Sequence, residues 1–395
     1  MMGKPKIRFK GYNEDWEQRK LGEVVEFLDT MRKPLEGAKR ISGPYPYYGA
    51  SGIVDYVDGY LFDEELILLS EDGANITDRN YPVCFLASGK YWVNNHAHVL
   101  KTKEGNENNF ICNSLERKDY KQYNTGMAMP KLNQEVCKGI PISCPTFAEQ
   151  KKIGDYFRRL DHLITLHQHK CDEMKKLKKY MLQKMFPQNG KKVPEIRFDG
   201  FTNDWEQRKL GKLGSLKNGM NFSKDAMGHG FPFVNLQNIF GSNVVNVNEL
   251  GLADATKKQL LEYSLLEGDV LFVRSSVKLE GVGEAALVPE NLENTTYSGF
   301  IIRFRDEYGL NNDFKKYIFG TKKVRNQIMA QATNSANKNI SQGVLENLTV
   351  EVPSFDEQAK IGEYFSNLDH LITLHQHKCD ELQNLKKYML QNMFV

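Results

Sequence analysis

A run of twelve residues, LDHLITLHQHKC, contains three histidines and one cysteine and occurs twice without a changed letter, at 160–171 and 368–379. Six of the nine histidines of the chain lie in these two copies. A histidine and a cysteine four residues apart on a helix, such as His167 and Cys171, can provide two ligands for zinc, and the second copy could complete a Cys2His2 tetrahedron. The same residues could instead belong to an apolar helix seam.

The spacing of the apolar residues favours the seam. They recur at alternating steps of four and three, which is the a/d pattern of a coiled coil. The predicted seam consists of Ile153, Phe157, Leu160, Ile164, His167, Cys171, Ile361, Phe365, Leu368, Ile372, His375 and Cys379. His167 is then a polar residue that sets the register of the helices, and Cys171 is a small core residue. His162 and His169 lie on a different face. We therefore assign no metal to this motif, and measuring bound zinc distinguishes the two interpretations.

The seam needs long helices, and the sequence predicts two. The segments 147–186 and 355–395 are close copies without an internal proline, and a helix of this length measures roughly 50–60 Å. A shorter repeat precedes each: IRFKGYNEDWEQRKLG at 7–22 and IRFDGFTNDWEQRKLG at 196–211, identical at twelve of sixteen positions. We predict a domain at 1–146, a helix at 147–186, a linker at 187–195, a second domain at 196–354 and a second helix at 355–395.

The segments between these repeats differ in sequence but share a plan. Each has a strand-like run after acidic residues, EELILLSEDG at 64–73 and EGDVLFVRSS at 267–276, followed by a stretch rich in β-branched and aromatic residues. The predicted fold class is α+β, with two α/β globular domains joined by two long antiparallel coiled-coil helices and related by a pseudo-two-fold axis. Two similar domains with diverged surfaces suggest two different contacts.

Composition narrows the possible environment of the chain. Of its 395 residues, 40% are hydrophobic and 26% charged, and the formal net charge is only +3. The N-terminal sequence has no apolar signal segment, no run is long enough to span a membrane, and the six cysteines form no CxxC motif. We expect a cytoplasmic protein with reduced thiols.

The whole chain resembles the specificity (S) subunit of a type I restriction–modification system. The resemblance rests on the duplicated RF-G-(x)4-W-(x)3-KLG motif, on the F-x-EQ-x-KIG-x-YF-x-x-LDHLITLHQ helices, and on phrases such as YPYYGASGI (45–53) and FPFVNLQNI (231–239). It implies a non-catalytic subunit whose two target-recognition domains read a bipartite double-stranded DNA target, with the paired helices setting the spacer. It also implies partners: two methyltransferase (M) subunits that bind S-adenosylmethionine, and restriction (R) subunits that use ATP and Mg²⁺.

Candidate DNA contacts are amides, hydroxyls, cations and aromatic loop residues, because such side chains can contact base edges or phosphates. Those in the first domain are Tyr47, Tyr48, Ser51, Asn94, Asn95, His96, His98 and Lys131. Those in the second domain are Asn221, Phe222, Asn235, Gln237, Asn238, Arg274, Ser275, Ser276, Lys278, Lys338 and Asn339. Each could instead form turns or stay exposed without contacting DNA.

Two other functions fit parts of the sequence. One is a metal-dependent enzyme built around the His/Cys repeats. The other is a coiled-coil scaffold that binds proteins without a DNA role. The sequence contains no P-loop, no HExxH and no nucleophile triad, so DNA recognition without catalysis remains the main prediction.

Overall fold

The computed structural model describes residues 4–188, 190–333 and 337–395; Asn189, within the predicted linker, lies outside them. The chain forms two compact units, one of residues 1–169 with 375–395 and the other of residues 170–374. Each unit holds a globular domain and parts of two long helices, α5 (Phe147–Lys184) and α10 (Phe355–Asn392). Of the described helices, none has both the length and the apolar content needed to cross a membrane.

The domain of the first unit is built on two four-stranded sheets. One has the order β2-β9-β6-β7 and is antiparallel throughout, and the other has the order β4-β3-β8-β5 with β3 and β8 parallel. Its strands are β1 (Glu17–Lys20), β2 (Val25–Phe27), β3 (Ser42–Gly49), β4 (Gly52–Val57), β5 (Phe62–Asp63), β6 (Leu66–Ser70), β7 (Cys84–Ala87), β8 (Lys90–Val93), β9 (Ala97–Thr102) and β10 (Pro141–Cys144). Its short helices are α1 (Leu21–Val24), α2 (Asn75–Asp78), α3 (Asn108–Glu116) and α4 (Gln134–Lys138).

The domain of the second unit repeats this plan. A sheet of order β12-β19-β15-β17 corresponds to the first sheet, and β13 pairs in parallel with β18 as β3 does with β8. Its strands are β11 (Glu206–Lys209), β12 (Gly214–Asn218), β13 (Met227–Val234), β14 (Gly251–Ala253), β15 (Val270–Val273), β16 (Ser275–Ser276), β17 (Ala285–Leu287), β18 (Thr296–Tyr297), β19 (Ile301–Asp306), β20 (Lys338–Asn339) and β21 (Thr349–Val352). Its short helices are α6 (Lys257–Glu262), α7 (Asn312–Ile318), α8 (Lys322–Gln331) and α9 (Gln342–Glu346). The predicted α/β fold of both domains is confirmed.

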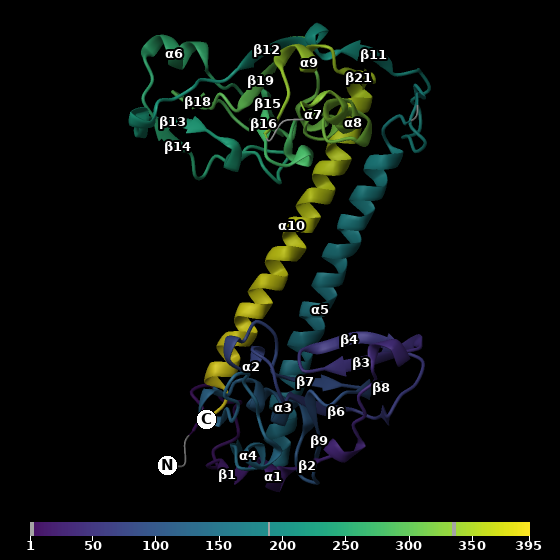
Figure 1. The fold of residues 1–395 in the computed structure, drawn as a ribbon, viewed down its shortest axis with the longest axis vertical. Coiled ribbons are helices and arrows are strands. Elements are labelled where there is room, and N and C mark those ends of the chain that lie inside the picture. Colours follow the sequence, from purple (N-terminus) through teal and green to yellow (C-terminus); the bar gives the residue numbers. More distant parts are fainter. Residues whose placement is uncertain (1–3, 189, 334–336) are drawn as a thin grey trace. The chain divides into compact units, whose positions relative to one another are not determined.

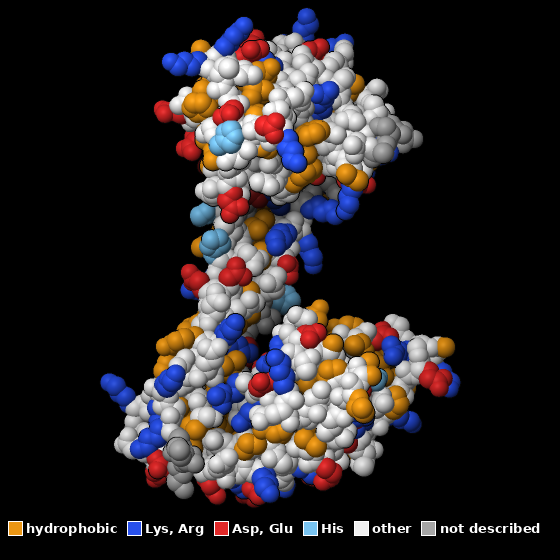
Figure 2. All heavy atoms as spheres, turned by 60° about the vertical axis from the view of Figure 1, so that its left-hand side comes forward, with side chains coloured by type: hydrophobic (Ala, Val, Ile, Leu, Met, Phe, Trp, Pro, Cys, Tyr) orange, Lys and Arg blue, Asp and Glu red, His pale blue; other side chains and the backbone are white. Residues whose placement is uncertain are grey.

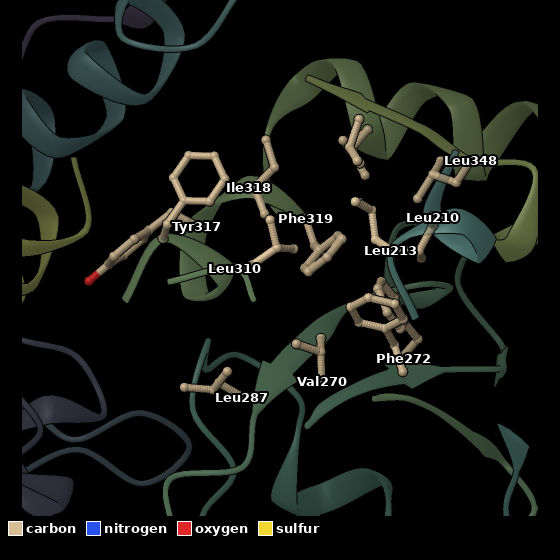
Figure 3. Packing of buried hydrophobic residues seen from close by; sticks show 14 of the residues in the cluster. Leu210, Leu213, Val270, Phe272, Leu287, Leu310, Tyr317, Ile318, Phe319 and Leu348 are labelled. Carbon is tan, nitrogen blue, oxygen red and sulfur yellow. The ribbon is translucent and has the colours of Figure 1, made fainter. Parts of the chain in front are cut away.

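Each core is closed by the end of the helix that begins in the other repeat. Figure 1 shows the C-terminal end of α10 beside the first domain. Just beyond this end, the Phe394 ring stacks on Phe110 with centroids 5.3 Å apart. In the second unit, Phe186 follows α5 and stacks on Phe314 at 5.8 Å. Figure 3 shows part of this second core, in which Phe272 of β15 meets Phe319 edge to face. Apolar burial therefore ties both repeats into each unit.

The repeated F-x-EQ motif fixes the start of each long helix. Glu149 is buried and accepts two hydrogen bonds from the Arg8 guanidinium, at 2.7 and 2.8 Å. Gln150 donates to the Pro145 carbonyl at 3.1 Å and accepts from the N–H of Glu107 at 3.1 Å. The second copy repeats these contacts through its own glutamate and glutamine, with Arg197, Pro353 and Asn311 as partners of Glu357 and Gln358. The short and long repeats therefore form one interlocked structural element.

The apolar residues of the predicted helix seam are buried or half-buried. Within each unit α5 and α10 run antiparallel, with Lys386 bound to Asp161 in one unit and Lys178 to Asp369 in the other, both at 2.5 Å. His167 and His375 face each other across the seam, with their Nδ1 atoms 3.0 Å apart. Because two ring nitrogens at this distance share one proton, one histidine donates to the other.

The cysteines of the seam use their thiols for packing and for weak hydrogen bonds. Cys171 donates to the Ile372 carbonyl at 3.8 Å, and Cys379 donates to the Ile164 carbonyl at 3.9 Å. His162 and His169 are exposed, as their position off the seam predicts. Among the described residues, the histidines and cysteines of the repeats form no group of three or more ligands. Measurement of bound zinc is the test of the alternative Cys2His2 site.

Candidate nucleic-acid interface

In the first domain, the loops that follow β3, β6 and β8 lie together at one edge. The N–H of Asn94, after β8, donates to the Tyr48 carbonyl on β3 at 3.0 Å. Ser70, at the end of β6, donates its hydroxyl to the carbonyl of Ala50, which precedes Ser51. Asp72 pairs with Lys131 in an isolated β-bridge. Three groups of candidates that are far apart in sequence are thus brought to one edge.

A network of charges supports this edge. Glu71 accepts from Arg32 at 2.6 Å and lies 3.3 Å from the ammonium group of Lys131. Asp72 binds the Nδ1 of His96 at 2.9 Å. Arg32 also donates to the Ala97 carbonyl at 2.8 Å, so it fixes the loop that carries His96. Sequence reasoning missed Arg32, because no motif surrounds it and its partners lie 39 and 65 residues away.

Tyr47, Asn94 and His98 are buried, which corrects their prediction as DNA contacts. The Tyr47 hydroxyl accepts from the N–H of Leu35 at 3.0 Å, and its ring packs in the core. The Asn94 side chain accepts from the N–H of His96 at 2.8 Å and so forms a turn. These buried side chains hold the loops in place. Of the other candidates in this domain, Ser51, Asn95, His96 and Lys131 are exposed and Tyr48 is half-buried.

His98 is a buried cation. Its Nε2 lies 2.7 Å from the Leu132 carbonyl, and its Nδ1 lies 2.6 Å from the Asp29 carboxylate. Both partners are acceptors, so both ring nitrogens carry protons. Burial is the largest single influence and alone would lower the pKa of His98. The hydrogen bond to Asp29, the Asp29 charge and the neighbouring Cys137 together outweigh burial and raise the pKa to about 10. In turn, the pKa of Asp29 is lowered: burial, the largest influence, opposes ionisation, but the hydrogen bond and charge of His98, the N–H of Val99 and the charge of Arg32 together overcome it.

This cation also bears on metal binding. Within the described residues, Asp29, Glu71 and His98 are the only group of three potential metal ligands close together. His98 has no free lone pair in this arrangement, and Arg32 lies 2.6 Å from Glu71 and 3.4 Å from Asp29. Protein cations therefore balance both carboxylates, and the donor set does not fit a metal ion.

The protonation of His98 gives a testable pH dependence. Because its folded pKa of about 10 lies above the unfolded value of about 6.5, the stability it contributes is complete below pH 6.5 and is lost as the pH rises toward 10. We expect the free energy of unfolding of the first unit to fall by up to about 1.4 kcal/mol per pH unit in this window. Urea titrations of the wild type and of His98→Gln measure it. An equal alkaline slope in both proteins contradicts the assignment.

In the second domain, β16 and β20 bring two distant candidate groups together. Ser275 pairs with Asn339, and Ser276 with Lys338. The N–H of Arg274 donates to the Phe300 carbonyl at 2.8 Å, and its guanidinium donates to the Gly299 carbonyl at 3.3 Å.

The remaining candidates of the second domain fall into two sets. The N–H of Gly299 donates to the Met220 carbonyl at 2.7 Å, and this bond places the exposed Asn221 beside the edge. The ring of Phe222 packs on Phe233. Asn238 is buried and donates to the carbonyls of Asn246 and Glu249, so its prediction as a DNA contact is corrected. The side chain of Asn235 accepts from the N–H of Gln237 at 2.9 Å, and of these two only Gln237 is exposed. Lys278 is exposed as well.

The edges of the two domains are equivalent in backbone but not in side chains. The N–H of Glu71 donates to the His96 carbonyl just as that of Arg274 donates to Phe300. The bond from Leu132 to the Glu71 carbonyl recurs between Ile340 and Arg274. The carboxylate of Glu71 in the first domain therefore takes the place of the guanidinium of Arg274 in the second domain. One scaffold presents two different chemical surfaces.

A second exposed feature lies on the helices, on faces away from the seam. Large apolar side chains with exposed fractions between 37% and 55% recur at equivalent positions of both repeats: Leu163, Leu166, Leu177, Tyr180, Leu371, Leu374, Leu385 and Tyr388. Apolar residues at such spacing on a solvent-facing helix surface are typical of a contact with another protein.

Comparison with known proteins agrees with this architecture. A family model described as the type I restriction modification DNA specificity domain matches the chain twice, over residues 13–176 and 202–384. The chain belongs to this family. Its members in type I systems are non-catalytic specificity subunits, and this chain is accordingly not an enzyme. The metal-dependent enzyme considered from the His/Cys repeats is thereby overturned.

Individual relatives of this specificity family cover different shares of the chain. A Haemophilus influenzae protein, provisionally named a type I restriction enzyme specificity subunit, is 36% identical over 144 residues, which is 36% of each chain. The type I restriction enzyme MjaVIII specificity subunit of Methanocaldococcus jannaschii is 19% identical over 95% of this chain and 91% of its own. The solved S subunit from M. genitalium aligns with a TM-score of 0.67 at 14% identity, covering 100% of this chain and 99% of its own, and so has the same fold.

Proposed function

We propose that the chain recognises a bipartite double-stranded DNA target, with one half-site contacted by each domain. The observation that carries the proposal is the pair of equivalent edges with different side chains, Glu71 and His96 in one domain and Arg274 and Phe300 in the other. Base edges in the major groove differ in their donors, acceptors and methyl groups, so different side chains on one scaffold select different bases. A scaffold for proteins alone would not need this divergence.

The long helices have two proposed roles. Their seam holds α5 and α10 in one register, and we propose that this fixes the length of the unread spacer. Their exposed apolar faces, such as Leu163 with Leu166 and Leu371 with Leu374, occur in two equivalent copies and suit two copies of one partner. We propose that these partners are methyltransferase (M) subunits that bind S-adenosylmethionine, joined in the full complex by restriction (R) subunits that use ATP and Mg²⁺.

The surface charge fits DNA binding in which partner subunits take part. On the face drawn in Figure 2, basic, acidic and hydrophobic side chains are interspersed over both globular parts. The formal net charge is +3. A protein that neutralises many phosphates alone is usually more basic, so partner subunits are expected to supply much of the phosphate contact.

Methylation mapping tests the proposal. The chain is expressed with its methyltransferase subunits in cells without other modification systems, and methylated adenines are located across the genome. We expect one bipartite motif with a spacer of constant length. Methylation that follows no sequence, or a continuous motif without a spacer, contradicts the proposed function.

Arg274→Ala tests the edge of the second domain. Because Arg274 is half-exposed beside β16, we expect a loss of binding of about 1–3 kcal/mol confined to one base position of one half-site. Binding of the assembled complex is measured on all single-base variants of the site. Lys257→Ala, which removes an exposed charge from α6, is the matched control. A uniform loss over all sequences would instead make Arg274 a phosphate contact.

A further inference from the structure

The residue directly before β9 in the first domain, and the residue directly before β19 in the second, each carry an exposed ring. In the first domain it is His96, whose carbonyl accepts from Glu71, and in the second it is Phe300, whose carbonyl accepts from Arg274. The Phe300 side chain is 58% exposed, although it follows a fully buried strand residue, Tyr297, by only three positions. Its N–H donates to the Ser298 hydroxyl at 3.3 Å, so the turn that presents the ring is ordered.

A pocket of about 490 Å³ lies beside this ring. Its apolar wall includes Phe300, Phe240 and Val277, and the latter two are 41% and 78% exposed. Its polar wall includes Ser275 and Ser276 of β16. The pocket is therefore continuous with the edge that carries Arg274, Lys338 and Asn339.

Two carboxylates also line the pocket. Glu280 and Glu284 border the pocket, and Glu284 also accepts from the N–H of Gly241 at 3.2 Å, next to Phe240. Carboxylates repel phosphate but accept hydrogen bonds from the amino groups of bases. Lys278 also borders the pocket. The pocket thus combines apolar surface, hydroxyls, acceptors and one cation, and its two carboxylates distinguish it from a phosphate site.

We propose that Phe300 is a specificity-determining residue and that its pocket takes the 5-methyl group of a thymine. In the major groove a T·A pair presents a methyl group, the O4 acceptor of thymine, and the N6 donor and N7 acceptor of adenine. The aromatic wall suits the methyl group, the serine hydroxyls can donate to O4 or N7, and the carboxylates can accept from N6. The inference rests on the proposed DNA recognition and names one base pair of the half-site contacted by the second domain.

The equivalent position of the first domain supports a role in discrimination. There the ring is an imidazole paired with Asp72 at 2.9 Å, and Asp72 stands where the second domain has Ser275. A polar pair in one domain and a phenyl ring beside an apolar pocket in the other would select different bases. The first domain is therefore not expected to depend on a thymine methyl group at this position.

Deoxyuridine substitution tests the inference, because uracil differs from thymine only by the methyl group. The complex with methyltransferase subunits is assayed on duplexes in which each thymine of the mapped target is replaced singly by deoxyuridine. We expect one position to weaken binding by about fourfold to tenfold, the effect of one buried methyl contact. Phe300→Ala should bind the thymine site more weakly by a similar factor and show no further loss with deoxyuridine. Phe300→Leu, which keeps an apolar contact, should retain part of the discrimination.

The outcomes separate this inference from the proposed function. A complex that binds its bipartite target but is indifferent to deoxyuridine at every position overturns the thymine assignment alone. So does a Phe300→Ala complex that keeps the full deoxyuridine penalty, or one that fails to assemble with the methyltransferase subunits, which would make the pocket a protein contact. A complex without any sequence preference overturns both. Leu261→Ala, at an exposed leucine of α6, is the control for loss of surface apolar area.

Discussion

Phe394→Ala is expected to lower the free energy of unfolding of the first unit by about 3–5 kcal/mol. The ring is 4% exposed and fills the space between Phe110, Phe157 and Trp16, with centroid distances of 5.3, 5.7 and 6.4 Å. Its removal leaves a cavity among large aromatic side chains that cannot collapse easily. Because the ring comes from the end of α10, the loss also loosens that helix from the domain.

The second unit offers a matched experiment. Phe186→Ala should destabilise the second unit by a similar amount, because Phe186 packs on Phe314, Phe365 and Trp205 at 5.8–6.0 Å. Denaturant unfolding followed by tryptophan fluorescence, with a Trp205→Phe background to isolate the first unit, assigns each transition. Phe147→Ala changes an exposed ring of the same helix repeat and should cost less than about 0.5 kcal/mol. Equal effects of Phe394→Ala and Phe147→Ala would refute this account of the core.

The helices and their seam could be predicted because a heptad pattern is local. Steps of four and three place Ile153, Phe157 and Leu160 on one face without any tertiary information, and all three are buried. The same pattern separated His167 from His162 and so reduced the apparent ligand cluster to a seam. The role of the EQ pair was not predictable, because its partners Arg8 and Glu107 lie 141 and 43 residues away.

The residues at the candidate DNA-binding edges could be predicted only as groups of loop residues. Loop composition identified segments that the structure brings together, but the burial of a loop side chain depends on distant partners. His98 is buried because Asp29, 69 residues away, neutralises it, and Asn238 is buried because it holds two carbonyls of a later loop. Phe300 was missed because a phenylalanine in a stretch rich in strand-forming residues is expected in the core, whereas the structure leaves its ring 58% exposed.

Lengthening both helices by one heptad is expected to lengthen the spacer without changing the half-sites. Duplicating residues 161–167 in α5 and 369–375 in α10 adds seven residues at the level where His167 faces His375. Seven residues add about 10.5 Å, the length of about three base pairs, and turn the helix face by only about 20°. Since each base pair also rotates the second half-site by about 35° around the DNA axis, we expect a spacer longer by about two to three base pairs.

The variant with both helices lengthened should bind the original target much more weakly than the wild type does. A complex that can engage only one half-site loses several base contacts, and two such contacts already cost about 2–6 kcal/mol, so binding should fall at least about thirtyfold. Methylation mapping of the variant complex measures both the half-sites and the spacer. Duplication in α5 alone is the control, because it breaks the pairing of the seam and should abolish recognition of any spacer. The insertion alters neither of the two domain edges. New half-sites, or an unchanged spacer when both helices are lengthened, would therefore show that the paired helices do not set the distance.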